Sequence, residues 1–145
     1  LMKKKAFIGV ESTNGASLNR LITIKDGILF NLLVTEMLAN YKLDMDNIID
    51  DFSLKFSKLF SREISIKKTP RRKNKFLQLQ SKKDFHFNEF RLIKIKYDDG
   101  IKFVFEDSWL LIRESGTNDL IRLYAESGML KKTKKLLDCG RKLLG

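Results

Sequence analysis

The sequence predicts an α+β fold, in which an antiparallel sheet is covered on one face by helices, and two patterns carry this prediction. Between residues 101 and 126, three apolar segments of strand length alternate with polar residues or are separated by turn residues. Over residues 28–41 and 128–144, apolar residues recur instead at helical spacing. The predicted order is strand, loop and two helices, then strand, helix, four strands and helix. Grouped strands and helices of this kind are typical of α+β layers.

Residues 1–52 predict one strand, a loop and two helices. Residues 5–10 have the apolar content of a short strand, and residues 11–20 have the polar and glycine-rich composition of a loop. Asp26 precedes the helix predicted over 28–41, where a carboxylate is favourable beside the helix N-terminus. One strand cannot form a sheet by itself. We therefore expect residues 1–52 to be the strand-loop-helix remnant of a preceding α/β domain.

Residues 53–145 are expected to form a domain of their own. A strand over 63–67 ends before the only proline, and a helix follows over 72–81. Residues 91–97 alternate again and lead into Asp98-Asp99-Gly100, a strong hairpin turn. The closing helix contains Gly140, which costs about 1 kcal/mol relative to alanine and is expected to interrupt the helix.

Composition restricts the class of protein. The length of 145 residues fits one domain, or one domain with part of another, and a hydrophobic content of 43% supports a packed core. A formal net charge of +11 indicates an anionic partner or a basic surface. The single cysteine, Cys139, excludes an internal disulfide and suits a reducing compartment, so a cytoplasmic protein is expected. No apolar run approaches the roughly 18 residues of a membrane span.

The loop between the last two predicted strands has the composition of an anion site. Arg113 stands at its entrance and Arg122 lies just inside the next strand. Between them, Ser115 and Thr117 supply hydroxyls, and Gly116 permits a turn with positive φ. Backbone N–H groups around a glycine form anion-binding concavities, and arginine matches phosphate oxygens two at a time. These residues alone leave two interpretations open: a phosphate site, or a hairpin connection whose hydroxyls satisfy their own turn.

Residues 99–127, DGIKFVFEDSWLLIRESGTNDLIRLYAES, resemble the C-terminal signature of the phosphohexomutases, the phosphoglucomutase/phosphomannomutase superfamily, with a pattern close to DGxKFxFxDGSWxLxRPSGTEPxxRxYxE. The resemblance implies a TATA-binding-protein-like fold for residues 53–145 and a site for the substrate phosphate made of Arg113, Ser115, Gly116, Thr117, Asn118 and Arg122. Glu114 and Asp119 replace prolines of the pattern, and Asn118 replaces a glutamate. We therefore expect a less pre-organised loop and weaker phosphate binding.

A second resemblance lies in the first part of the chain. In phosphohexomutases, a GGExSGG loop precedes a helix of the form KDGIxxxLLLxEML at a fixed distance. Residues 8–15, IGVESTNG, lead in the same way to residues 25–38, KDGILFNLLVTEML. The resemblance implies that Glu11 and Thr13 hold sugar hydroxyls, and carboxylate and hydroxyl oxygens are suitable partners for such groups.

The resemblance also implies what other parts of the protein supply. Phosphohexomutases transfer phosphate through a phosphoserine in their first domain, beside Mg²⁺ held by a DGDxDR-type loop, and neither motif occurs here. No catalytic residue or metal ligand is therefore expected in this chain, which alone is expected to be inactive. The intact enzyme would interconvert hexose 1-phosphate and hexose 6-phosphate with Mg²⁺ as its cofactor. Its remaining domains are the expected partners, and the hexose is left open among glucose, mannose and an amino sugar.

A basic nucleic-acid-binding module is the alternative from a different class. Basic residues concentrate over 62–83, and Phe76, Phe85 and Phe87 lie nearby for base stacking. No recognition motif accompanies them, and lysines are spread along the chain as on many solvated surfaces. A mutase fragment that acts only as an interaction domain is a third interpretation. The single histidine, His86, has no serine or cysteine at motif spacing and is interpreted as structural.

Overall fold

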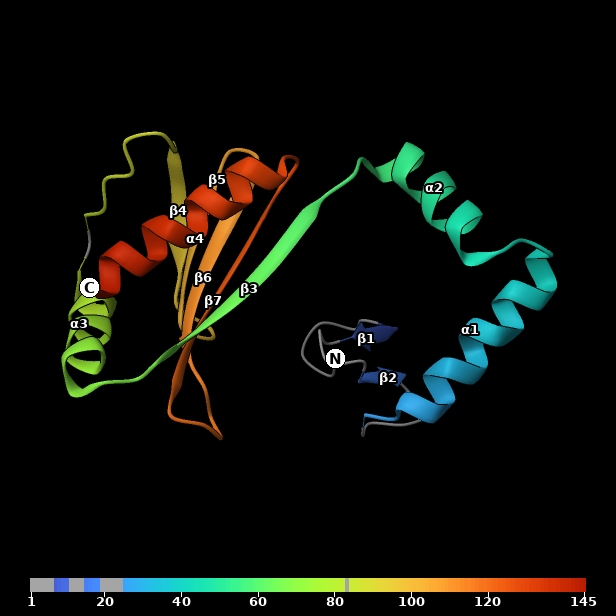
Figure 1. Cartoon of the computed structure of the whole chain (residues 1–145), viewed down its shortest axis with the longest axis horizontal. Coiled ribbons are helices and arrows are strands. Elements are labelled where there is room, and N and C mark those ends of the chain that lie inside the picture. Colours follow the sequence, from blue (N-terminus) through green and yellow to red (C-terminus); the bar gives the residue numbers. More distant parts are fainter. Residues whose placement is uncertain (1–6, 11–14, 19–24, 83) are drawn as a thin grey trace. The chain divides into compact units, whose positions relative to one another are not determined.

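The chain consists of two compact units, Leu1–Phe56 and Ser57–Gly145, in a computed structural model that describes residues 7–10, 15–18, 25–82 and 84–145 (Figure 1). Each unit is described by itself below. The boundary expected after residue 52 stays a prediction for the intact protein; residue 52 lies within the last helix of the first unit.

The first unit holds a two-stranded antiparallel sheet and two helices: β1 (Ile8–Val10), β2 (Ala16–Leu18), α1 (Gly27–Tyr41) and α2 (Met45–Phe56). The expectation of a loop throughout residues 11–20 is wrong at β2. Ala16, Ser17 and Leu18 pair with β1, and this pairing, rather than any local pattern, makes three residues a strand. The expectation of a single strand in this part of the chain is wrong for the same reason.

Carboxylates lie at the start of both helices, and for the first of them the sequence predicts this. Asp26 Oδ1 accepts hydrogen bonds from the backbone N–H groups of Ile28 and Leu29, at 2.9 and 3.0 Å. Asp44 Oδ1 accepts from the backbone N–H of Asn47 at 2.9 Å. These bonds satisfy N–H groups that have no partner within a helix, so the helix predicted over 28–41 is confirmed with its cap.

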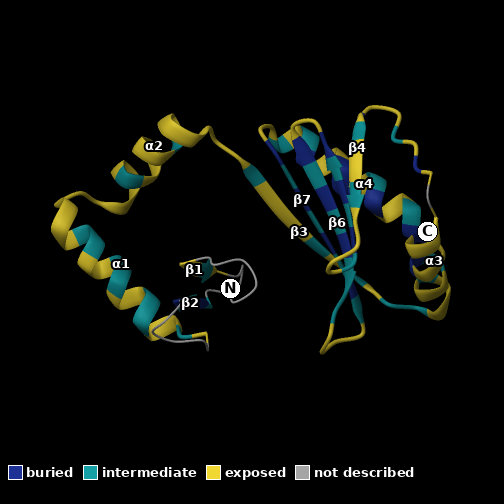
Figure 2. Cartoon of the chain, turned by 180° about the vertical axis from the view of Figure 1, so that it is seen from behind, coloured by how far each residue is buried: buried dark blue, intermediate teal, exposed yellow. Residues whose placement is uncertain are grey.

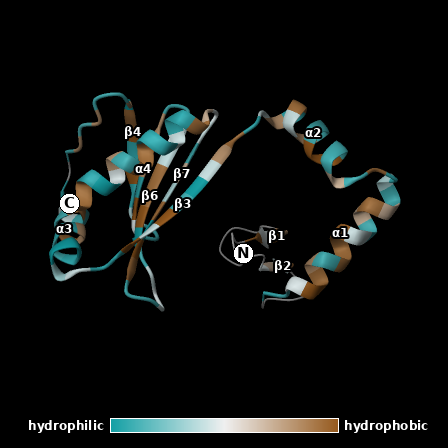
Figure 3. Ribbon diagram, viewed as in Figure 1, coloured by the Kyte–Doolittle hydropathy of each residue, from teal (hydrophilic) through white to brown (hydrophobic). Residues whose placement is uncertain are grey.

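The helices of the first unit expose much of their apolar surface. No described residue of α1 or α2 is buried within the unit, and apolar residues occur around most of α1 (Figure 3). Ile28 is 78% exposed and Leu54 is 87% exposed. A helix that is apolar on most sides is normally enclosed by other elements, so this surface is suited to contact with further protein.

The second unit is a five-stranded antiparallel sheet with helices. Its elements are β3 (Phe60–Lys67), α3 (Pro70–Ser81), β4 (Leu92–Lys96), β5 (Ile101–Phe105), β6 (Ser108–Glu114), β7 (Leu120–Ser127) and α4 (Leu130–Leu144), in the sheet order β3-β7-β6-β5-β4. Every pair of neighbouring strands is antiparallel. The predicted α+β class is thereby confirmed. The first strand of the unit pairs with the last, which places residues 60–67 beside residues 120–127.

Side chains alternate between the two faces of this sheet. One face holds the core, onto which α4 packs over β3, β6 and β7, while α3 contributes Phe76 and Leu79 (Figure 2). The fully enclosed side chains of the core include those of Ile101, Phe103, Leu110, Ile112, Ile121, Leu123, Leu136 and Leu144. The other face has no helix of this unit on it, and there the intervening residues of β5, β6 and β7 are half-buried. We call it the open face.

Gly140 does not interrupt the closing helix, contrary to the sequence-based expectation. Helix α4 continues through it to Leu144, and Gly140 is buried against the sheet. A Cβ atom at this position would lie 2.6 Å from Leu123 Cδ2 and 3.2 Å from Leu110 Cδ1. The missing side chain therefore lets α4 approach β6 and β7 closely, and this packing outweighs the low helix propensity of glycine.

Candidate phosphate-binding site

Two arginines lie opposite each other on the open face. Arg113 of β6 and Arg122 of β7 are direct partners in the strand register. Directly opposed side chains of an antiparallel pair lie close enough to interact, and like charges there are unfavourable. An anion placed beside both guanidinium groups would remove this repulsion and accept charge-assisted hydrogen bonds from each.

Each arginine has a carboxylate partner of its own. Arg113 Nη1 donates to Asp99 Oδ2 at 3.1 Å, and its guanidinium carbon lies 5.7 Å from the centre of the Tyr124 ring. Interactions with Tyr124 and then Asp99 raise the pKa of Arg113 above its ordinary value, so its guanidinium stays charged. Arg122 Nη1 lies 3.5 Å from Glu63 Oε1. These partners hold the two side chains without using all of their donors.

One donor of Arg122 is buried without a partner. Its Nε atom is buried and has no hydrogen-bond partner among the described residues. Burying an N–H group without an acceptor is costly, and such groups are uncommon in folded proteins. The carboxylate partner of Arg122 is Glu63, rather than one of the acids that flank the loop. The pairing of β3 with β7 brings Glu63 to this place.

The loop 115–119 projects beyond the end of the sheet between β6 and β7 (Figure 1). The Ser115 N–H donates to the Leu120 carbonyl at 2.9 Å, and the Asn118 N–H donates to Ser115 Oγ at 3.3 Å. The Ser115 hydroxyl thus satisfies its own turn, as the hairpin interpretation expects. Within the described part of the chain, the backbone N–H groups of Gly116 and Thr117 donate to no protein acceptor. Both groups belong to exposed residues and are available to an anion.

Two glycines at the site differ in what they do. Gly116 is not among the described residues with positive φ, so the loop does not use the conformation that a glycine permits there. A Cβ atom there would meet nothing within 4 Å. Gly100, in the predicted turn between β4 and β5, has a φ of 93°. Its Cβ would lie 2.4 Å from the Ile112 carbonyl oxygen and 2.7 Å from Arg113 Cβ, so glycine is needed here for Arg113 to keep its place.

Lys68, which the sequence did not single out, lies at the base of the loop. Its ammonium is 3.9 Å from Glu114 Oε1 and 3.6 Å from Asp119 Oδ1, and its backbone N–H donates to the Asp119 carbonyl at 2.9 Å. Glu114 follows Arg113 in a strand, so its side chain projects from the other side of the sheet. The two acids that replace prolines of the family pattern therefore share one cation.

The strand register brings Arg113 and Arg122 together, and the loop residues 115–118 of the candidate site follow β6 in the same unit. Glu11 and Thr13, the predicted sugar contacts, lie outside the described residues, as does Lys83 of the basic segment. Asp99, Glu63 and Lys68 were missed because they come from other strands or turns. Of these three residues, only Asp99 had a signal in the sequence: it belongs to the turn before the strand that pairs with the strand of Arg113.

The described residues hold no group of three or more histidine, cysteine, aspartate or glutamate side chains arranged to bind a metal ion. Asp44, Asp46, Asp50 and Asp51 lie at or on α2 and are exposed. The part of the chain that the structure describes therefore offers no ligand set that fits the Mg²⁺ implied by the family resemblance for the intact enzyme. Among the described helices, none has the length and apolar character needed to cross a membrane.

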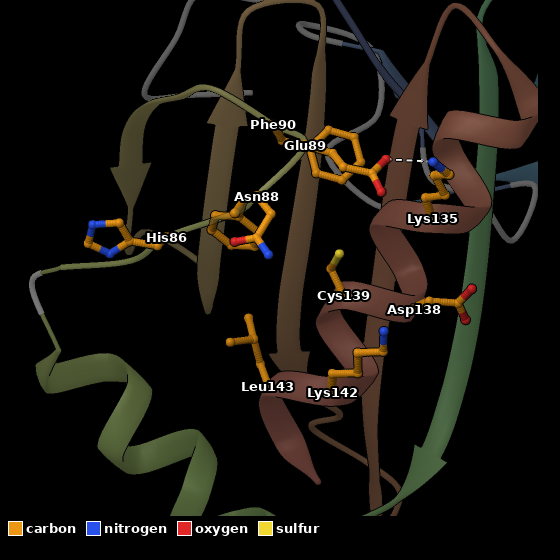
Figure 4. Close-up of a pocket in the computed structure, with 10 residues that line it drawn as sticks. His86, Asn88, Glu89, Phe90, Lys135, Asp138, Cys139, Lys142 and Leu143 are labelled. Atoms are coloured by element: carbon orange, nitrogen blue, oxygen red, sulfur yellow. Dashed lines mark hydrogen bonds and ion pairs between the residues drawn. The ribbon is translucent and has the colours of Figure 1, made fainter.

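A cavity of about 470 Å³ lies on the helical side of the sheet, between the segment 86–90 and α4 (Figure 4). Glu89 forms an ion pair with Lys135, which lowers the pKa of Glu89. Burial raises the pKa of the Cys139 thiol, which disfavours the reactive thiolate. His86 is exposed. This cavity has no activated nucleophile and does not share the loop arginines.

The aromatic part of the nucleic-acid interpretation is wrong. Phe76 is 3% exposed and Phe85 is 8% exposed, and both belong to the core. Phe87 packs edge-on against Phe103 and Phe105, with ring centres 5.0 Å apart in each case. These rings are held by the sheet and are not available for base stacking.

Comparison with known proteins agrees with both parts of the chain. Residues 67–138 match the family model for the C-terminal domain of phosphoglucomutase/phosphomannomutase, and residues 1–56 match the model for the alpha/beta/alpha domain III of the same family. Two crystal structures have the same fold over 99% of this chain. A phosphoglucomutase/phosphomannomutase family protein from Burkholderia thailandensis has a TM-score of 0.67 at 16% identity, and a protein from Thermus thermophilus assigned as a phosphomannomutase has 0.69 at 23%. The chain covers 29% and 28% of these proteins, respectively.

Curated relatives are longer than this chain. A phosphoglucomutase/phosphomannomutase from Thermococcus kodakarensis is 27% identical over 99% of the chain, which covers 30% of that protein. A phosphoglucosamine mutase from Methanocaldococcus jannaschii is 34% identical over 82% of the chain, which covers 25% of it. The matched models, the signature over residues 99–127 and the shared fold agree. The chain belongs to the phosphoglucomutase/phosphomannomutase family and corresponds to the C-terminal portion of its members.

Proposed function

We propose that this chain is the part of a phosphohexomutase that holds the phosphate and the sugar hydroxyls of the substrate. The intact enzyme interconverts hexose 1-phosphate and hexose 6-phosphate. The observation that carries the proposal is the pairing of Arg113 with Arg122 beside two unused backbone N–H groups of the loop 115–119. Such a set of donors matches a phosphate that carries negative charge on several oxygens.

In this proposal the loop holds the phosphate that is not reacting. Binding energy from a remote phosphate fixes the position of the reacting oxygen, which affects turnover as well as substrate binding. Ser115, Thr117 and Asn118 would complete the phosphate site, and Glu11 with Thr13 would hold sugar hydroxyls. The family membership of both parts of the chain supports these assignments.

The remaining domains of the same enzyme are the proposed partners of this chain. They would supply the phosphoserine and the ligands of Mg²⁺, so the chain alone would not turn over substrate. The exposed apolar surface of α1 and α2 supports this proposal, because such a surface needs further elements to enclose it. The single cysteine supports a cytoplasmic location.

The test is kinetic and uses the full-length enzyme. Arg113→Lys keeps the charge but loses the two-point geometry of the guanidinium. We expect kcat/KM for hexose 1-phosphate to fall about ten- to hundred-fold, the equivalent of one charge-assisted hydrogen bond. Arg91→Lys, at an exposed arginine away from the loop, is the matched control and should leave kcat/KM unchanged. An Arg113→Lys enzyme with unaltered kcat/KM would contradict the proposal.

A further inference from the structure

Ion pairs at and beside the loop 115–119 join seven charged side chains, and among these the acids outnumber the bases. Among the residues joined by ion pairs here, the cations are Arg113, Arg122 and Lys68, and the carboxylates are Asp99, Glu63, Glu114 and Asp119. Each arginine has one carboxylate, whereas Lys68 serves two. Whether an anion binds here therefore depends on which cation offsets the excess of carboxylate charge.

Lys68 is fixed in the structure. Its backbone N–H donates to the Asp119 carbonyl, which extends the pairing of β3 with β7 by one hydrogen bond. Its side chain is 21% exposed, so its charge is only partly screened by water. The next residues begin α3, where Thr69 Oγ1 accepts from the Arg72 N–H. The backbone of Lys68 is thus held at the base of the loop on both sides of the residue.

Glu114 depends on Lys68 more than Asp119 does. The Asp119 side chain is 82% exposed and is solvated by water, whereas that of Glu114 is 34% exposed. Glu114 Oε1 is buried without any hydrogen-bond donor among the described residues, and the nearest recorded cation is Lys68 at 3.9 Å. Without Lys68, this oxygen would carry uncompensated negative charge one residue from Arg113.

We propose that Lys68 is a positioning residue of the phosphate site: it offsets Glu114, which precedes the loop, and Asp119, which ends it, so that the loop still attracts an anion. The inference rests on the proposed function, because it concerns the phosphate bound at this loop. Lys68 does not itself touch the phosphate. It acts through the charge and position of the two acids.

The experiment titrates the 145-residue chain with inorganic phosphate at constant ionic strength and follows the backbone amides of Ser115 to Asn118 by NMR. Lys68→Met keeps most of the aliphatic stem and should weaken phosphate binding about fivefold, the effect of one charge at several ångström in a partly screened medium. Lys68→Arg should bind as the parent does. Lys73→Met, at an exposed lysine of α3, makes the same change in net charge and should have little effect.

The decisive variant combines Lys68→Met with Glu114→Gln and Asp119→Asn. If Lys68 acts by offsetting these charges, Lys68→Met should cost little phosphate affinity once Glu114→Gln and Asp119→Asn are present, so the triple variant should bind nearly as well as the variant with both acids replaced. If Lys68 only holds the backbone, Lys68→Met should cost about fivefold in both backgrounds, and that result would overturn the inference. Equal binding by Lys68→Met and the parent would overturn it as well.

A further variant covers the case in which Lys68→Met does not fold. Glu114→Gln with Asp119→Asn in the parent leaves Lys68 in place and should raise phosphate affinity severalfold; unchanged affinity would count against the inference. The proposed function fails in a different way. In that case the loop amides of the unaltered chain do not respond to phosphate at all, and the role of Lys68 is withdrawn with it.

Discussion

Arg113 and Arg122 are direct partners across β6 and β7, and their carboxylates come from opposite directions. Asp99 belongs to the turn before β5, and Glu63 belongs to β3 on the other side of β7. Each guanidinium group is therefore held by a carboxylate on the side away from the other arginine, while the two arginines stay opposite each other. This arrangement keeps two like charges together at the site where a dianion would be bound.

Changes at Arg122 and at its partner should have opposite effects on phosphate affinity. Arg122→Lys loses the fork of donors, so we expect the affinity of the chain for inorganic phosphate to fall about tenfold. Glu63→Gln releases Arg122 from its carboxylate, so affinity should rise about two- to fivefold. Phosphate titrations of both variants and measurements of their melting temperatures check this prediction.

The same pair of variants separates binding from structure. If Arg122 serves only as a partner of Glu63, Arg122→Lys lowers the melting temperature and leaves phosphate affinity unchanged. Glu63→Gln would then also lower the melting temperature without a gain in affinity. That combination would remove Arg122 from the site.

Gly116→Ala should weaken phosphate binding without weakening the fold. A methyl group there meets nothing within 4 Å, and the residue has no positive φ, so the free energy of unfolding should stay the same or rise by about 0.4–1 kcal/mol. The methyl group would stand beside the free N–H groups and keep an anion away from them. Gly128→Ala, which also meets open space, is the control: it should affect stability in the same way and leave phosphate affinity unchanged. Equal phosphate affinity in both variants would show that the backbone of the loop does not bind the anion.

Gly100→Ala should lower both stability and phosphate affinity. Its φ of 93° is unfavourable for alanine, and its Cβ would overlap with the Ile112 carbonyl and with Arg113. We expect the free energy of unfolding to fall by about 2 kcal/mol or more. Urea unfolding measures this loss, and phosphate titration measures the displacement of Arg113. Parent-like values in both measurements would contradict the position assigned to Gly100.

The sequence predicts most elements of the second unit because their local patterns are strong. Residues 101–105 alternate, and the Asp98-Asp99-Gly100 turn fixes a hairpin. The helix predicted over 72–81 is present as α3, which begins two residues earlier, at Pro70 after the cap Thr69. Strand β2 was missed because its three residues carry no pattern of their own. Gly140 was misjudged because its helix propensity is local, whereas its contact with Leu123 belongs to the tertiary structure.

Only the part of the candidate site that lies in one continuous segment was predicted from the sequence. Arg113, Gly116 and Arg122 lie within ten residues, so the motif brings them together. Glu63 lies in β3, and Lys68 directly follows that strand. The pairing of β3 with β7 joins the first and last strands of the unit, and no spacing in the sequence indicates that these strands are neighbours. The ion pairs that hold Arg122 and the loop acids were therefore beyond a sequence-based prediction.

The most direct test of the phosphate site is a titration of the 145-residue chain with inorganic phosphate, followed by NMR of the backbone amides at constant ionic strength. The account predicts that the amides of Ser115 to Asn118 shift most and saturate, and that chloride at the same ionic strength does not reproduce the change. Shifts confined to the basic residues between Arg62 and Lys82, with unchanged loop amides, would contradict it.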